Sequence, residues 1–195
     1  METIPLDSDA RERLIQAAQT LLWERGFMGT SPAAIQHAAG AGQGSMYHHF
    51  KGKEELALAA IQRSADELWL HCEASFSIGG SAYDRIAAYL QAEREILRGC
   101  RIGRLTQDPD IMGSAALRAP VDALFARLKA RLTDIIEAGR ARGEFTFPVD
   151  TLSLAEMIVA VVQGGYVVAK AANDTLPFTR ALAAVLGLLR SGEKS

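Results

Sequence analysis

Side chains that can contact nucleic acid are concentrated in one short stretch, residues 43–53. They comprise an amide, a hydroxyl, a phenol, two imidazoles and two amines, from Gln43, Ser45, Tyr47, His48, His49, Lys51 and Lys53. An amide can form two hydrogen bonds with adenine, and a hydroxyl can reach a base edge or a phosphate. These residue types can form hydrogen bonds with bases and contacts with phosphates.

Two pairs within this stretch have different expected roles. His48 and His49 are neighbours in what reads as a short helix, so their side chains point about 100° apart and cannot read the same base. For His49, an inward and hydrogen-bonded position is the open alternative. Lys51 and Lys53 flank the start of the next helix, whose dipole favours an anion. We therefore predict that the lysines contact phosphates.

The sequence gives little support to other chemistries. It has no Gly-x-Ser-x-Gly, no Walker loop and no glycine-rich turn after a strand. Neighbouring His71 and Cys72 do not share a helix face, so with Cys100 they do not form a metal-binding set. Two cysteines suit a reducing compartment. We predict no enzymatic activity, no cofactor and no metal site.

Charge and hydropathy set further limits. The chain has 195 residues and a net charge of −2, which does not by itself indicate a nucleic-acid partner. Between Arg25 and Lys53, however, there are three basic residues and no acidic ones, as phosphate attraction requires. No apolar run approaches the ~18–20 residues that span a bilayer, and the first nine residues lack the features of a secretory signal. We expect a cytoplasmic protein without a membrane partner.

The elements that must position these side chains are two short helices joined by a glycine-containing turn. Ser31 is suited to cap the first helix, Pro32 to occupy its first position, and Gly40 to end it. The second helix runs from Gln43 to Phe50, and a long helix follows from about Lys53. This pattern is typical of a helix-turn-helix.

Several motifs then resemble one family. They are Ala39-Gly40, Gly44-Ser45-Met46-Tyr47-His48-His49-Phe50 and Lys53-Glu54-Glu55-Leu56. Together they look like the signature of the tetracycline-repressor (TetR) family of bacterial transcription regulators, over roughly residues 11–58. One departure is Gly42, where the family more often has a small hydroxyl residue. The resemblance implies that Tyr47 donates its hydroxyl to a phosphate. The complete set of DNA-contacting candidates is Thr30, Ser31, Gln43, Gly44, Ser45, Tyr47, His48, His49, Lys51 and Lys53.

We predict an all-α chain with two domains. Residues 1–52 form a three-helix DNA-binding domain, in which the first helix presents Leu14, Ile15, Ala18, Leu21 and Leu22 as an apolar stripe. Residues 53–195 form a helical bundle for ligand binding and dimerisation. Within the bundle we expect helices over about 53–76, 82–98, 114–142, 150–170 and 176–190, and a turn at Asp108-Pro109-Asp110.

The family places a small-molecule effector inside this bundle. Large side chains interleaved with polar groups make up our candidates, which are Trp69, Phe76, Tyr89, Arg101, Met112, Phe125, Gln163 and Tyr166. A mostly apolar cavity with a few polar groups is what a small-molecule site looks like. For any single aromatic residue, a place in the ordinary core is the alternative.

The last two helices are the candidates for a homodimer interface. Apolar residues nearly surround the first and form a stripe on the second, and our interface set is Leu154, Ile158, Val161, Gly165, Val168, Leu182, Val185 and Leu189. The alternative is that these residues form the core of one subunit.

The sequence thus predicts a homodimeric transcription regulator that binds operator DNA. By resemblance it is a repressor released by a small molecule. The alternatives are a helical interaction protein or an enzyme that kept the fold without operator binding. Selection from random DNA duplexes separates these, because both alternatives predict that no sequence is enriched.

Overall fold

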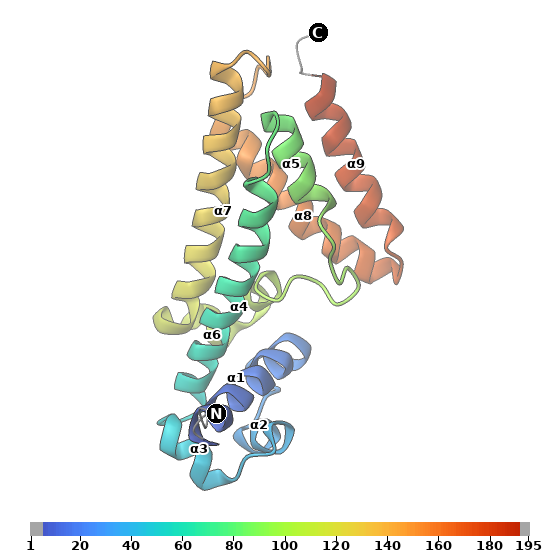
Figure 1. Cartoon of the computed structure of the whole chain (residues 1–195). Helices are drawn as coiled ribbons and strands as arrows, with labels where there is room; N and C mark the ends of the chain where they lie inside the picture. Colours follow the sequence, from blue (N-terminus) through green and yellow to red (C-terminus); the bar gives the residue numbers. More distant parts are fainter. Residues whose placement is uncertain (1–5, 192–195) are drawn as a thin grey trace. The chain divides into compact units, whose positions relative to one another are not determined.

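The computed structural model describes residues 6–191, and these residues fold into helices, as predicted (Figure 1). In chain order they are α1 (Leu6–Arg25), α2 (Pro32–Ala39), α3 (Gln43–His49), α4 (Lys53–Phe76), α5 (Ala82–Gln91), the 3-10 helix η1 (Gly103–Gln107), α6 (Pro109–Gly113), α7 (Ala115–Ala141), α8 (Thr151–Ala172) and α9 (Leu176–Ser191).

The helices form two compact units that do not follow chain order. Within the described residues, the first unit extends to Glu67 and resumes from Arg101 to Ala123, and the second holds 68–100 and the chain from Leu124 onward. α4 and α7 each contribute to both units. The first unit is larger than the 1–52 stretch predicted to bind DNA, and that functional boundary stays a prediction.

The first unit is built on the apolar stripe of α1. Its five predicted residues are all buried, and α2 and α3 pack against this helix (Figure 1). Polar contacts fix the arrangement: Arg13 Nε donates to the carbonyl oxygen of Ala39 at 3.0 Å. The Arg63 guanidinium on α4 binds both oxygens of Glu12 at 2.6 and 3.1 Å, which holds the pKa of that carboxyl below its ordinary value.

The second unit depends on close helix contacts at two glycines. A Cβ atom at Gly165 of α8 would lie 2.8 Å from the Phe178 ring of α9, and one at Gly139 of α7 would lie 2.6 Å from Ala82 Cβ of α5. Both distances are shorter than atoms tolerate, so glycine permits the approach. Gly165 therefore supports the packing of α8 on α9.

Two expected boundaries are wrong. The helix expected over 82–98 ends at Gln91, where the Arg94 guanidinium turns back to the carbonyl oxygens of Tyr89, Leu90 and Ala92. A side chain thus satisfies carbonyls that end the helix. The turn expected at Asp108 is instead the start of α6, which Asp108 caps.

One helix bears on the expectation that no apolar run is long enough to span a bilayer. α8 is long and apolar enough to cross a bilayer by length and composition alone. Core helices can pass the same test. Seven residues of α8 are buried within its unit, including Ile158 and Val162, so much of its apolar surface forms core.

Candidate nucleic-acid interface

Local signals define both helices of the helix-turn-helix. The Ser31 Oγ accepts the backbone N–H of Ala34 at 3.1 Å and caps α2, with Pro32 at the first helical position. Gly40 ends α2 in the left-handed conformation at φ 58°, which glycine adopts without a Cβ penalty. Gly42 then occupies the capping position of α3.

α3 has one exposed face and one buried anchor. Gln43, Gly44, Tyr47 and His48 are exposed, at i and i+4 positions that share one side of the helix. Met46 points the other way and is fully buried. Tyr47 is 51% exposed although it is a large aromatic residue. The helix therefore presents an amide, a phenol and an imidazole to solvent from a fixed base.

The remaining α3 candidates lie at the edge of this face. Ser45 and His49 are half-buried. The His49 ring lies 5.1 Å from that of His48 and 6.4 Å from that of Phe50, between centroids, and its Nε2 is shielded from solvent. These positions favour the inward alternative for His49.

The two hydroxyl residues before α2 differ in availability. Thr30 is fully buried, and its hydroxyl donates to the carbonyl oxygen of Gly26 at 2.7 Å. Its side chain closes the α1–α2 turn and is not available to a phosphate in this conformation. Ser31 is exposed at the N-terminus of α2, whose first turn has no acidic residue, and this end remains a candidate for phosphate contact.

The start of α4 is less suited to an anion than expected. Glu54 and Glu55 lie in its first turn, and a Glu55 oxygen accepts the backbone N–H of Lys51 at 2.7 Å. These carboxylates already interact favourably with the positive end of the helix dipole. The amines therefore remain the phosphate candidates: Lys51 is exposed, and Lys53 Nζ lies 3.9 Å from the Phe27 ring centroid.

Gly42 offers a stabilising substitution. It has an extended conformation, φ −74° and ψ 162°, and makes no side-chain cap for α3, while a Cβ atom there would meet open space. Gly42→Ser should raise the free energy of unfolding by about 0.5–1 kcal/mol, through a new cap and a less flexible unfolded chain. Urea unfolding measures this change. Gly42→Ala is the matched control without the hydroxyl, and a serine variant no more stable than the alanine variant would contradict a capping effect.

The predicted effector residues divide between the two units. Arg101 and Met112 belong to the first unit, and the other six belong to the second. In the second, Phe76 and Tyr89 are buried with ring centroids 4.7 Å apart, and Tyr166 lies 4.8 Å from Phe178. Trp69, Phe125 and Gln163 are half-buried, and Arg127 stacks on the Trp69 ring at 4.1 Å.

Polar groups accompany these aromatic residues, and of these Arg94 is half-buried and Cys72 is buried. Arg94 lies over the Tyr89 ring at 5.2 Å, a contact that sequence reasoning missed because only the bent chain after α5 creates it. Burial raises the pKa of Tyr89 and Tyr166, and it raises that of the Cys72 thiol to about 12. At neutral pH Cys72 is therefore a protonated core residue, and no disulfide joins it to Cys100.

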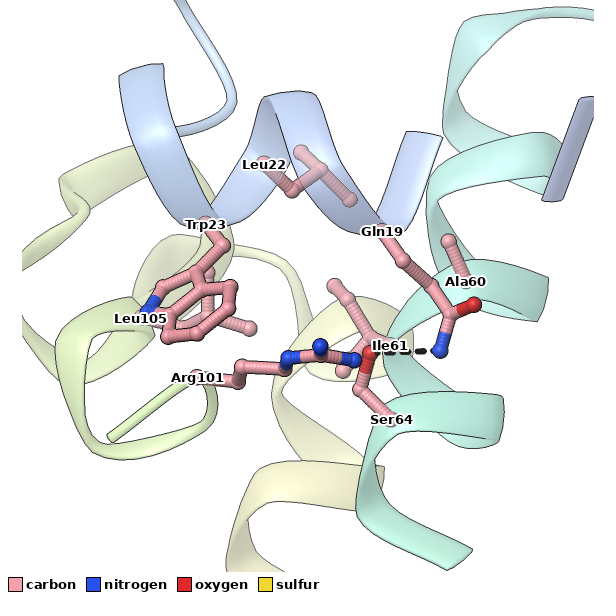
Figure 2. A pocket seen from close by; sticks show the side chains of 8 residues that line it. All are labelled: Gln19, Leu22, Trp23, Ala60, Ile61, Ser64, Arg101 and Leu105. Carbon is pink, nitrogen blue, oxygen red and sulfur yellow. Dashed lines mark hydrogen bonds between the residues drawn. The ribbon is translucent and has the colours of Figure 1, made fainter. Parts of the chain in front are cut away.

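The first unit contains a small cavity beside α1. Its volume is about 10 Å³, roughly enough for one water molecule. The lining residues come from α1, α4 and the 101–105 segment, and are Gln19, Leu22, Trp23, Ala60, Ile61, Ser64, Arg101 and Leu105 (Figure 2). Gln19 Nε2 donates to the Ser64 hydroxyl at 3.0 Å across it. This cavity is too small for an effector.

Six of the eight predicted interface residues lie inside the chain. Leu154, Ile158, Gly165, Leu182, Val185 and Leu189 are buried in the single subunit, so the structure assigns them to its core, as the alternative reading proposed. Val161 is half-buried and Val168 is exposed. A homodimer interface formed by α8 and α9 stays a prediction.

The exposed apolar residues of the same two helices form another set, which shares only Val168 with the predicted interface. On α8 it comprises Met157, Ala160, Gly164, Val167 and Val168, and on α9 it comprises Ala183, Ala184, Gly187 and Leu188. Val167 is 69% exposed and Leu188 is 60% exposed. We call these nine residues the α8–α9 face. On each helix these residues are spaced three or four apart, which places them on one side. The sequence contains this spacing, but it does not show which side of the helix is buried.

Comparisons with known proteins agree with this geometry. A family model described as "Bacterial regulatory proteins, tetR family" matches residues 14–60, and one described as "Tetracyclin repressor-like, C-terminal domain" matches residues 81–185. The HTH-type transcriptional repressor NemR of Escherichia coli K12 is 27% identical over 190 residues, covering 94% of this chain and 95% of that protein.

Solved structures resemble the chain over most of its length. The reduced form of E. coli NemR has a TM-score of 0.80 and 28% identity, with 91% of this chain and 95% of that chain covered. A TetR transcriptional regulator from Chloroflexus aurantiacus has a TM-score of 0.87 and 26% identity, with 97% and 98% covered.

Proposed function

The chain belongs to the TetR family of bacterial regulatory proteins, and we propose that it is a ligand-responsive transcriptional repressor that binds operator DNA as a homodimer. The exposed face of α3 carries this proposal. Gln43, Tyr47 and His48 project from a helix whose opposite side is anchored by Met46. A helix presented in this way can enter the major groove and read base edges.

The proposed division of labour follows from side-chain chemistry. Gln43 reads a base, because its amide can both donate and accept. Tyr47, Lys51 and the N-terminus of α2 at Ser31 contact phosphates, which position the protein without specifying sequence. Gly44 has no side chain, so the DNA can approach the α3 backbone closely.

A dimer is needed because one helix-turn-helix reads a half-site only. Two-fold dimers place two reading helices about one helical turn of DNA apart. The α8–α9 face is the proposed contact, since it is apolar and exposed on the single chain. We further propose that the soluble, cytoplasmic dimer binds its effector among the aromatic residues of the second unit, including Tyr89 and Tyr166.

Release from DNA requires a difference in affinity. An effector shifts the protein away from the operator only if it binds the DNA-incompetent conformation more tightly. The buried aromatic rings and the Arg94 side chain suggest a moderately apolar effector with a polar group. The alternative function is that of an interaction protein or an enzyme with the same fold. This alternative predicts that the protein binds no operator.

Selection from random duplexes tests the proposal, and Gln43→Ala then tests the reading role. We expect wild-type protein to enrich one two-fold related sequence. Gln43→Ala should lose about 1–3 kcal/mol of discrimination at one base pair of each half-site, measured by binding to operators substituted base by base. Gln62→Ala, an exposed glutamine on α4, is the matched control. A Gln43→Ala protein with unchanged base preference would remove Gln43 from the reading role, and failure to enrich any sequence would refute the proposed function.

A further inference from the structure

The α1–α2 turn is held by residues from a distant part of the sequence. The segment 101–108 lies in the same compact unit as the helix-turn-helix. Arg104 Nη1 donates to the carbonyl oxygen of Trp23 in the last turn of α1, at 2.6 Å. The Arg101 guanidinium lies 4.5 Å from the Trp23 ring centroid, as Figure 2 shows beside the small cavity. These contacts hold the segment 101–108 against the C-terminal end of α1.

Asp108 makes the next contact and uses its two oxygens differently. Oδ1 accepts the backbone N–H groups of Asp110 and Ile111 at 3.1 and 3.3 Å, which caps α6. Oδ2 accepts the backbone N–H of Phe27 at 2.6 Å. It also lies so close to Gly26 that a Cβ atom there would be 2.8 Å from it.

The Phe27 contact lies in the turn that leads from α1 into α2. Gly26 ends α1 at φ +72°, and its carbonyl oxygen accepts the buried Thr30 hydroxyl. Ser31 then caps α2. Between α1 and α2, the backbone path is therefore fixed from both sides, by Thr30 within the turn and by Asp108 from outside it.

We propose that Asp108 is a positioning residue for DNA binding, although it lies outside the helix-turn-helix. It fixes the α1–α2 turn through the Phe27 N–H and thereby holds the α2 N-terminus and α3 in the geometry that binds an operator. This inference rests on the proposed function. It also connects the segment 101–108, which lies along the chain between the two parts of the second unit, to the turn that precedes α2.

Capping of α6 alone does not account for this arrangement. Serine caps a helix about as well as aspartate, but its hydroxyl is too short to cap α6 and also reach Phe27. Asp108→Ser therefore keeps the cap of α6 and removes the hydrogen bond from the Phe27 N–H. Asp108→Asn is a near-isosteric second variant, because its single oxygen can serve only one of the two sets of N–H groups and its NH2 group, a donor, would face the other. Asp150→Ser is the matched control, since Asp150 caps α8 through Ser153 in the other unit.

The test uses full-length protein and the selected operator. Asp108→Ser should bind the operator about tenfold or more weakly and should show faster hydrogen exchange at the Phe27 amide. Asp108→Asn should change both in the same direction, and Asp150→Ser should show neither. Circular dichroism should show the same helix content in all variants.

The outcomes separate this inference from the function on which it rests. If Asp108→Ser binds the operator as tightly as wild type, the positioning role is wrong, whether or not exchange at Phe27 has increased. Equal losses of affinity in Asp108→Ser and Asp150→Ser would also overturn it, because exchanging aspartate for serine at any helix cap would then be sufficient. A wild-type protein that enriches no sequence would instead overturn the proposed function itself.

Discussion

A protein with glutamate in place of both Val167 and Leu188 should be a monomer that binds operator roughly 10²–10⁴-fold more weakly than wild type. Both residues belong to the α8–α9 face and are largely exposed on the single chain. In a two-fold contact each substitution occurs twice, so four carboxylates would enter one apolar interface. Burying unpaired charge is costly enough to prevent association. The loss in DNA affinity follows, because a monomer engages only one half-site.

Light scattering at micromolar concentration measures the assembly, and titration of labelled operator measures the affinity. The control replaces Leu70 of α4, which is 67% exposed but lies outside the α8–α9 face, with glutamate. It should remain a dimer with near wild-type affinity. A double variant that still has the mass of two chains would show that the proposed interface is wrong.

The sequence was most informative where structure depends on neighbouring residues. Ser31, Pro32 and Gly40 predicted both ends of α2, because capping and left-handed backbone conformations are properties of single residue types. The α1 stripe was likewise correct, since one apolar face on a polar helix has only one way to be buried.

The sequence was least informative where contacts between distant segments determine the structure. The end of α5 at Gln91 depends on Arg94 folding back onto helix carbonyls, and no periodicity encodes that contact. α8 is apolar on nearly all sides, so its pattern could not tell which side packs on its own subunit. The structure separates the two sides: Ile158 is buried, whereas Val167 is exposed.

The candidate sites show the same limit. Gln43 and Tyr47 are exposed as expected, because they lie opposite Met46 on one short helix. Thr30 is buried, since the turn uses its hydroxyl internally. Arg101 and the aromatic residues of the second unit belong to different compact units, a division that cuts across chain order and could not be read from it.

Met46 should have the largest effect of any side chain on α3. The helix has seven residues, its N-cap makes no side-chain hydrogen bond, and Met46 is its one buried residue. Helices this short are not stable alone, so the position of α3 depends on tertiary packing. Met46 is fully buried, and its sulfur accepts Gln36 Nε2 at 3.2 Å. Met46→Ala should therefore lower the free energy of unfolding by about 2–5 kcal/mol.

The same substitution should also weaken operator binding, because α3 carries the reading side chains. The rest of the fold should be less affected than α3. Urea unfolding and operator titration measure the two effects. Met28→Ala is the matched control: Met28 is 74% exposed in the same unit, so the change in its unfolding free energy should stay within about 0.5 kcal/mol. Adding Gly42→Ser to Met46→Ala should recover part of the lost stability and part of the lost operator affinity, since a new cap stabilises the same helix at its N-terminus. If Met46→Ala bound operator like wild type, α3 would not need this anchor, and the exposed face that supports the proposed function would have to be held by other contacts.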